Sequence, residues 1–254
     1  MKKFVVLCTI FCIFLGCTSS ESVQKPADST VSHLISIPEP GGLVFIGVSG
    51  PQLKPEQEIE AAREDAARKV SMYHGLNASF ASVQSMGTNA LDYYSDSNFQ
   101  MDYDNALDRY MESLSYDPKR DVTYGNGSVF VRFSYPGIFP GDINYSFANN
   151  VDGSPEWIKR PPLEINGFMA QTGFARRQQR IKDTIARASE DAIAGLISRS
   201  SARIRTNESA NDNQNSSVVV QRSRGRLLYF MVLETWIDPK DMSVWILAVA
   251  KDTN

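Results

Sequence analysis

Apolar and polar residues divide the chain into stretches with different patterns. Residues 4–15 form an apolar run behind two lysines, and this run is too short to cross a bilayer as a helix. A positive start followed by such a run is typical of a signal peptide, which we expect over 1–16. Residues 17–40 are rich in Ser, Thr, Pro and Glu, which predicts a flexible tether with His33 as a solvated linker residue.

The first folded element expected is a buried strand over 43–48, because a run of branched and aromatic residues follows two glycines there. Pro55 then suits the first turn of a helix, where acidic residues also gather. Gly75 marks the end of this helix. Apolar positions at spacings of three and four predict one buried helix face, formed by Ile59, Ala62, Ala66, Val70 and Tyr73.

Much of this pattern returns later in the chain. Three places agree: 59–66 with 185–192, Gly47 with Gly173, and Ser128–Val131 with Ser243–Ile246. Chance similarity between two Ala-rich helices is the alternative, but agreement at strand, helix and hairpin favours a tandem repeat. We therefore expect two units, over 41–150 and 151–254.

Each unit is expected to run from a strand through a long helix to several strands that end in a hairpin. The hairpin turns are expected at Tyr124–Gly127 and Asp238–Asp241. Small residues would let each helix lie close to its sheet, namely Ala62, Ala66, Ala188 and Ala192. The predicted fold class is therefore α+β, with antiparallel sheets each covered by a long helix.

The first unit carries an insertion over 87–117, in which acidic residues are interleaved with aromatic ones. Part of it keeps helical spacing, which predicts an extra amphipathic helix through Tyr103, Leu107, Tyr110 and Leu114. Three carboxylates loosely resemble a calcium loop: Asp102, Asp104 and Asp108. The glycine and the distal glutamate of an EF-hand are missing, so we expect a solvated acidic face instead of a metal site. A polar stretch over 207–217 reads as an exposed loop.

Charge changes the picture of possible partners. The chain of 254 residues has 26 Lys and Arg against 29 Asp and Glu, an ordinary globular balance that argues against a general nucleic-acid binder. The first unit is acidic, with a net charge of −6, and the second is basic, with +3. Arg222, Arg224 and Arg226 alternate, so on a strand they would project from one face.

Basic residues also crowd the start of the second helix: Arg176, Arg177, Arg180 and Lys182. These charges have three interpretations. They form a solvated face; or the acidic unit meets the basic one, within a chain or between neighbours; or the arginine stripe binds an anionic envelope polymer or a lipid headgroup.

Signals of catalysis are almost absent. The sequence lacks the glycine-rich phosphate loops, the H-E-x-x-H zinc motif and the G-x-S-x-G nucleophile elbow. Outside the tether the one histidine is His74, which lies at a helix end beside Gly75 and suits a solvated or capping role. We therefore expect no enzyme activity, no cofactor and no metal.

The end of the apolar run has chemistry of its own. The segment Phe14–Cys17, followed by Thr18, resembles a bacterial lipoprotein lipobox, although Phe14 replaces the usual leucine. That resemblance implies cleavage before Cys17, attachment of diacylglycerol to its thiol and anchoring in a membrane. The other two cysteines, Cys8 and Cys12, would leave with the signal peptide, so no disulfide is expected. Thr18 replaces the aspartate that retains lipoproteins in the inner membrane of enteric bacteria, which favours the outer membrane.

The two units, taken with the lipobox, resemble the LPP-twenty type lipoprotein family, which includes the FlgP-, FlgO- and FlgT-related envelope modules. The resembling residues share an A-x-x-x-A spacing with E-D-A and a strand glycine: Gly47, Ala62, Glu64, Asp65 and Ala66, then Gly173, Ala188, Glu190, Asp191 and Ala192. The resemblance implies a non-enzymatic outer-membrane lipoprotein that forms homo-oligomers, with a flagellar association in some members. Two units instead of one, and the insertion, depart from the family.

Three hypotheses follow for function. The first is an envelope lipoprotein that faces the periplasm or the surface and acts through contacts with itself or other envelope proteins. The second is a binding module for an anionic polymer that uses Arg222, Arg224 and Arg226. The third is a cell-wall hydrolase, which no motif supports.

Overall fold

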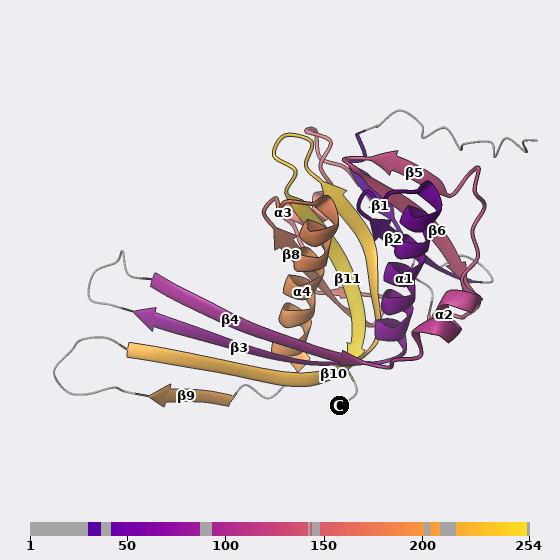
Figure 1. Ribbon diagram of the computed structural model, residues 1–254. Coiled ribbons are helices and arrows are strands. Elements are labelled where there is room, and N and C mark those ends of the chain that lie inside the picture. Colours follow the sequence, from indigo (N-terminus) through magenta and orange to yellow (C-terminus); the bar gives the residue numbers. More distant parts are fainter. Residues whose placement is uncertain are drawn as a thin grey trace, which may run out of the picture.

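The computed structural model describes most of the chain that follows the predicted signal peptide. The described residues are 30–36, 42–86, 93–141, 143, 148–200, 204–208 and 217–252, without the side chains of 81–98, 204–222 and 252. Cys17 and the lipobox lie outside them. Four helices and antiparallel strands confirm the α+β class (Figure 1).

The smaller sheet has three strands in the order β2-β6-β5. They are β2 (Leu43–Ser49), β5 (Val122–Gly125) and β6 (Ser128–Tyr135). The turn between β5 and β6 places Asn126 and Gly127 at φ values of 53° and 67°. Both residue types tolerate this left-handed region, so the turn predicted from the sequence is confirmed.

Helix α1 (Pro55–His74) packs against this sheet as predicted. It has Pro55 at its first turn and ends at Gly75, whose N–H bonds to the carbonyl of Ser71. Four of the five residues of the predicted face are buried, and Ile59 is half-buried at its edge. Spacing alone therefore located both the helix and its buried side.

The larger sheet has eight strands and contains most of the second half of the chain. Its main order is β4-β3-β10-β11-β8-β7, and β1 and β9 also pair with β10. The strands are β1 (His33–Ile35), β3 (Leu76–Met86), β4 (Tyr93–Tyr103), β7 (Glu164–Ile165), β8 (Phe168–Ala175), β9 (Ile204–Glu208), β10 (Ser217–Ile237) and β11 (Val244–Asp252). The remaining helices are α2 (Leu107–Ser113), α3 (Glu156–Lys159) and α4 (Ile181–Ser200).

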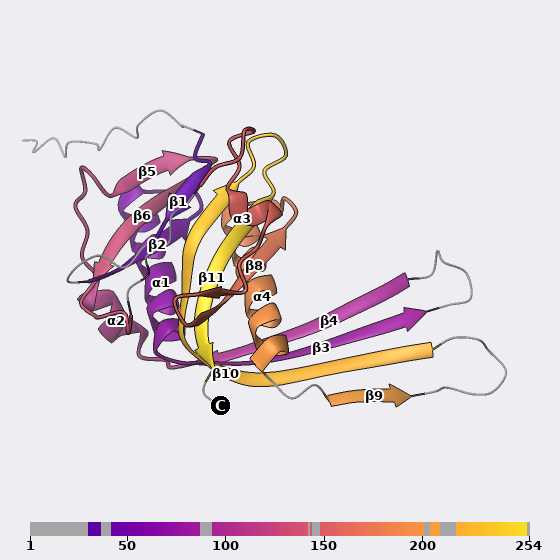
Figure 2. The ribbon, with the colours of Figure 1, turned by 180° about the vertical axis from the view of Figure 1, so that it is seen from behind.

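Strand β10 belongs to two parts of the molecule. Residues 217–227 pair with β3, whereas its later residues pair with β11 and β1. Between these parts Tyr229 has a φ of 56° and the register with β11 shifts. Such a bulge bends a strand. Beyond the bend β3, β4, β9 and residues 217–226 of β10 extend away from the helices, and we call these strands the arm (Figures 1 and 2).

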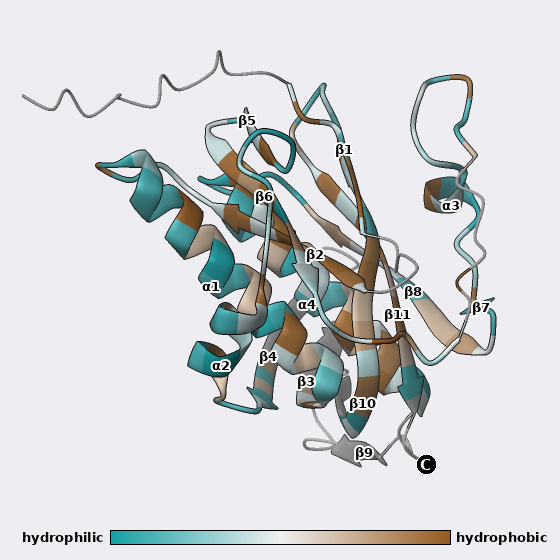
Figure 3. Ribbon diagram, turned by 90° about the vertical axis from the view of Figure 1, so that its right-hand side faces the viewer, coloured by the Kyte–Doolittle hydropathy of each residue, from teal (hydrophilic) through white to brown (hydrophobic). Residues whose placement is uncertain are grey.

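The described elements outside the arm, which we call the body, pack together as one unit. Both faces of β10 and β11 are buried: Met231 and Leu247 contact the cluster around α1, whereas Phe230 and Ile246 contact the cluster around α4. Figure 3 shows these strands as hydrophobic stretches between helices with hydrophilic outer turns. The cluster around α4 also contains Val48 of the smaller sheet, so side chains from both halves share one interior.

Two joints between a strand and a helix have the same geometry. A Cβ added to Gly47 would lie 2.0 Å from the carbonyl oxygen of Ala62, and one added to Gly173 would lie 2.0 Å from that of Ala188. Only glycine allows backbones to approach so closely. The alanines at the predicted helix positions are fully buried, as expected for close contact: Ala62, Ala66, Ala188 and Ala192.

An aspartate completes each joint. Asp65 Oδ2 accepts a hydrogen bond of 2.9 Å from the backbone N–H of Val48, and Asp191 Oδ2 accepts one of 3.0 Å from that of Phe174. Each carboxylate therefore satisfies a strand donor that points toward the helix. The strand glycine also sits in matching registers, since Gly47 lies opposite Val131 and Gly173 opposite Ile246.

The structure corrects three expectations for the first half. The strands of the first unit were expected to form a sheet of their own under its helix, but β3 and β4 join β10 in the larger sheet, so two separate units over 41–150 and 151–254 are not confirmed. The tether was expected to run to residue 40, but His33–Ile35 form β1 on the edge of β10. The insertion was expected to be helical from Tyr103, but Tyr103 ends β4 and only Leu107–Ser113 form a helix. In each of these places pairing with another strand decided the conformation, and spacing within the segment did not reveal it.

Candidate interaction surface

The arginine stripe lies on β10 within the arm. Arg222, Arg224 and Arg226 pair with Ala81, Ser79 and Asn77 of β3. The side chains of Arg224 and Arg226 are exposed, whereas Ser223 between them and Leu227 after them are buried. The predicted one-sided projection is therefore confirmed for Arg224 and Arg226, and the side chain of Arg222 lies outside the description.

The same face of the arm changes sign from one strand to the next. Arg226 lies opposite Asn77, which lies opposite Asp102 of β4. Asn77, Gln100 and Asp102 are all exposed. The acidic strand β4 and the basic part of β10 thus lie in the same sheet, with β3 between them.

The other face of the arm is partly covered by α4. Phe99 and Tyr103 of β4 pack against the cluster that contains Leu196 and Ile197 of α4. Met101, between them, keeps 37% of its surface exposed. This face is therefore apolar where the arm leaves the body.

Arg226 has a structural role at the root of the arm. A Cβ on Gly75 would lie 3.5 Å from its Nη2, so the guanidinium group lies against the end of α1. Positive charge at the C-terminus of a helix is favourable. Arg226 thus connects the arm to α1 and is less suited than Arg224 to a purely external role.

A buried carboxylate holds β1 to the body. Glu234 is fully buried, and its two oxygens bond to the ring Nε2 of His33 and to the indole N–H of Trp157, the latter at 2.6 Å. The His33 ring also packs edge-on against Trp236. His33 is therefore a structural residue and not the solvated linker histidine that the sequence suggested.

The segment before β1 is fixed as well. The Asn126 side chain donates a hydrogen bond of 2.5 Å to the carbonyl of Val31, and Ile237 N–H donates one of 2.8 Å to Ser32. The sequence pattern did not identify Trp157, Glu234 and Asn126 as residues that hold this segment. The one signal that could have found Glu234 is a charged residue inside an otherwise apolar strand pattern.

His74 belongs to an aromatic cluster on the first unit. Its ring stacks on Tyr110 at 5.4 Å and 12°, and its Nε2 lies 2.9 Å from the hydroxyl of Tyr135. Burial, with a smaller contribution from Arg109, holds the pKa of His74 below its ordinary value. Burial also raises the pKa of Tyr73 to about 12. These contacts join α1, α2 and β6, and Asp104 bonds to the Tyr110 hydroxyl beside the imidazole.

Asp104 of the candidate calcium loop bonds within its own chain. Its Oδ2 accepts a hydrogen bond from Tyr110, and its Oδ1 accepts one from the N–H of Ala106. Asp102 lies on β4. Among the described residues, no three His, Cys, Asp or Glu side chains are grouped as metal ligands would be.

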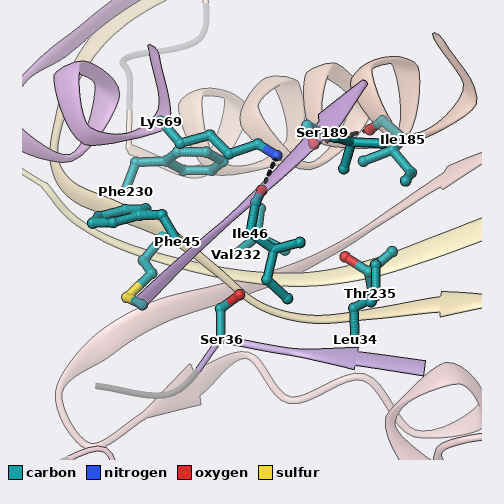
Figure 4. Close-up of a pocket in the computed structure, with 12 residues that line it drawn as sticks. Leu34, Ser36, Phe45, Ile46, Lys69, Ile185, Ser189, Phe230, Val232 and Thr235 are labelled. Atoms are coloured by element: carbon teal, nitrogen blue, oxygen red, sulfur yellow. Dashed lines mark hydrogen bonds between the residues drawn. The ribbon is translucent and has the colours of Figure 1, made fainter. Parts of the chain in front are cut away.

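Two hollows lie where elements of both halves meet. An apolar cavity of about 30 Å³ lies between Phe45, Phe230 and Ile185, with the Lys69 ammonium group donating to the carbonyl of Ile46 at 2.6 Å (Figure 4). It has room for about one water molecule and is far smaller than a ligand pocket. A cleft of about 300 Å³ lies at the start of α4, lined in part by Arg177 and Arg180.

Two of the basic residues near the start of α4, Arg177 and Arg180, thus line this cleft. Arg176, Arg177 and Arg180 are exposed there. Within the described part of the chain, no helix is long and apolar enough to cross a bilayer. Comparison with family models, curated proteins and solved structures found no match.

Proposed function

We propose that this chain is a lipid-anchored protein of the bacterial envelope, held in the outer membrane through Cys17, that acts by contacts with other copies and with other envelope proteins. The observation that carries the proposal is the arm. It extends a four-stranded sheet away from the helices, with exposed charges on one face (Figure 2). One face of the arm packs against α4 near the body, whereas its opposite face carries Arg224 and Asp102 exposed to a partner.

We assign the chain to the LPP-twenty type lipoprotein family, with two copies of its unit. The glycine, alanine and aspartate positions of the motif that suggested this family build the two joints, so these positions have a physical role in this chain. Support comes from the equal approach of Gly47 and Gly173 to their helices and from the equal hydrogen bonds of Asp65 and Asp191. We propose no catalytic role for this chain.

The anchor is tested by labelling cells with an alkyne-bearing fatty acid. The parent chain should carry the label, and Cys17→Ser should carry none and should leave the membrane fraction. Acyl chains on one cysteine are enough for stable anchoring when two or more are attached. A labelled Cys17→Ser chain, or a parent chain without label, would contradict the anchor.

The contacts are tested by cross-linking in intact source cells, followed by purification and mass spectrometry of the linked chains. Self-links, with or without other envelope proteins, are the expected result. A parent chain that stays unlinked, in cells where a known envelope oligomer links efficiently, would overturn the proposed function.

A second candidate function is binding of an anionic envelope polymer, favoured by the exposed pair Arg224 and Arg226. Heparin can serve as a probe polymer. Arg224→Gln should weaken binding, and binding by the parent should collapse at about 0.5 M salt because screening becomes short-ranged. Arg160→Gln is the matched control, since Arg160 is also exposed but lies outside the arm. Equal binding by both variants would dismiss this candidate.

A further inference from the structure

Strand β4 forms an open edge of the larger sheet. It pairs with β3 along all eleven of its residues, and no described strand pairs with its other side. An open edge presents a row of backbone donors and acceptors to any strand that approaches. Proteins often protect such edges with lysine or proline, and β4 contains neither.

The charges of β4 suit a second copy of the same strand. Asn98 is the midpoint of Tyr93–Tyr103, so an antiparallel pair of full length centres on it. In that register Asp96 lies opposite the second copy's Gln100, and Asp102 lies opposite its Tyr94. Moving the centre by one residue, to Phe99, would place Asp96 opposite Asp102. Like charges directly opposite each other destabilise a pair, and the full-length register avoids that arrangement.

The other edge of the arm, strand β9, fits less well. Strand β9 has five residues, so pairing it with β4 of a neighbour would leave more than half of that edge uncovered. An antiparallel pair of two β4 strands leaves nothing uncovered. A contact that uses the same surface on both copies gives a closed two-fold dimer.

The length of the arm also keeps the bodies of two paired copies from colliding. Strand β4 runs from the tip at Tyr93 to the body at Tyr103, and in both views the outer part of the arm extends beyond the helices (Figures 1 and 2). In an antiparallel pair the bodies therefore lie at opposite ends of the joined strands, about 36 Å apart along an eleven-residue strand. Met101, partly exposed on this edge, would be covered by the second sheet.

We infer that β4 is the self-assembly strand: two copies pair antiparallel through β4 about a two-fold axis at Asn98, which makes one continuous sheet from both arms. This inference rests on the proposed self-assembly and names the surface that carries it. The polar faces of the two arms lie on the same side of the joined sheet, because the two-fold axis is perpendicular to it.

Single cysteines test the register in the full-length chain in source cells. Opposite residues of an antiparallel pair have Cα atoms about 4.5–5.5 Å apart, within disulfide range. Asn98→Cys should therefore form a disulfide-linked dimer on mild oxidation. Tyr94→Cys is the matched control, because two copies of residue 94 would lie about 27 Å apart and should give about tenfold less dimer. Tyr94→Cys expressed together with Asp102→Cys should link.

Cross-linking of the unsubstituted chain shows whether a negative result contradicts this inference or the proposed function. If amine cross-linking gives self-links for that chain but Asn98→Cys gives no disulfide dimer, assembly uses another surface and the inference is wrong. If Asn98→Cys links only to Thr206→Cys on β9, the contact is head-to-tail and the two-fold pairing is wrong. Absence of any link for the unsubstituted chain would overturn the proposed function itself.

A second variant avoids oxidation. Asn98→Asp would place two carboxylates opposite each other, and we expect a weakening of self-association by about fivefold at low salt, reduced at high salt. Ser79→Asp is the control, because Ser79 lies on β3, inside the sheet, opposite Gln100 and Arg224 and therefore opposite no carboxylate. Equal weakening by both substitutions would contradict pairing at β4.

Discussion

The two strand–helix joints can be tested directly, because one added methyl group should push each strand away from its helix. Replacing Gly173 with alanine would place a Cβ 2.0 Å from the carbonyl oxygen of Ala188 and 2.7 Å from the backbone nitrogen of Ala192. Ordinary contacts of a Cβ begin at 3.4 Å. The clashing atoms belong to the helix backbone and cannot rotate away, so strand and helix must move apart by more than an ångström.

Overpacking of a well-packed interior usually costs about 1–3 kcal/mol, and contact with backbone atoms favours the upper end. For Gly47→Ala and Gly173→Ala we therefore expect losses of about 3 kcal/mol each. In a chain of this size such a loss lowers the melting temperature by roughly 6–12 °C. The two losses should be similar, since the approach distances are equal.

The measurement is thermal and urea unfolding followed by circular dichroism. Gly50→Ala is the matched control, because its nearest neighbour would be Arg180 Cδ at 3.8 Å. This control should be neutral or slightly stabilising, since alanine restricts the unfolded chain more than glycine does. Midpoints of Gly47→Ala and Gly173→Ala within about 2 °C of the parent would refute the reasoning. A loss for only one of them would refute the equivalence of the joints.

The other predictions concern packing and pH. Ala66→Leu and Ala192→Leu should each cost about 1–3 kcal/mol, because both alanines are fully buried under their helices; unchanged melting midpoints would contradict this. The lowered pKa of His74 means that the unfolded chain binds its proton more tightly, so stability should fall as the pH drops through about 6.5. His74→Gln should flatten that slope in urea titrations between pH 7 and 5, and an unchanged slope would count against it. The hydrogen bond from Arg120 lowers the pKa of Asp121, so its stabilisation is present above about pH 3.9 and is lost as the pH falls through the lowered value. Asp121→Asn should therefore reduce stability at pH 7 and much less at pH 2, and equal losses at both would show that ionisation is irrelevant.

Self-pairing of β4 would also protect the long open edge of the larger sheet from other strands. An isolated edge of eleven residues invites uncontrolled pairing. A two-fold contact closes on itself, so it removes both edges at once. The opposite edge is shorter, since β9 has five residues.

Local patterns were enough for features that depend on neighbours along the chain. The face of α1 followed from apolar spacing, and the turn at Asn126 and Gly127 followed from residues that tolerate positive φ. The repeated glycines also stood out, although the sequence did not reveal why they matter. Gly173 is needed because a helix carbonyl occupies the space that its side chain would fill.

Features that join distant segments needed the folded chain. Strand β1 has three residues and too little apolar character to be recognised, and it exists because β10 offers it an edge and Glu234 bonds to His33. From the sequence, β4 resembled an acidic insertion, because its residues are mainly polar and aromatic and show no clear alternation of apolar and polar positions. Its pairing with β3 makes it a strand. Helices and tight turns are thus encoded by residues a few positions apart. Sheet edges, buried charges and the arm depend on which strands meet, and that choice is made by packing across the whole chain.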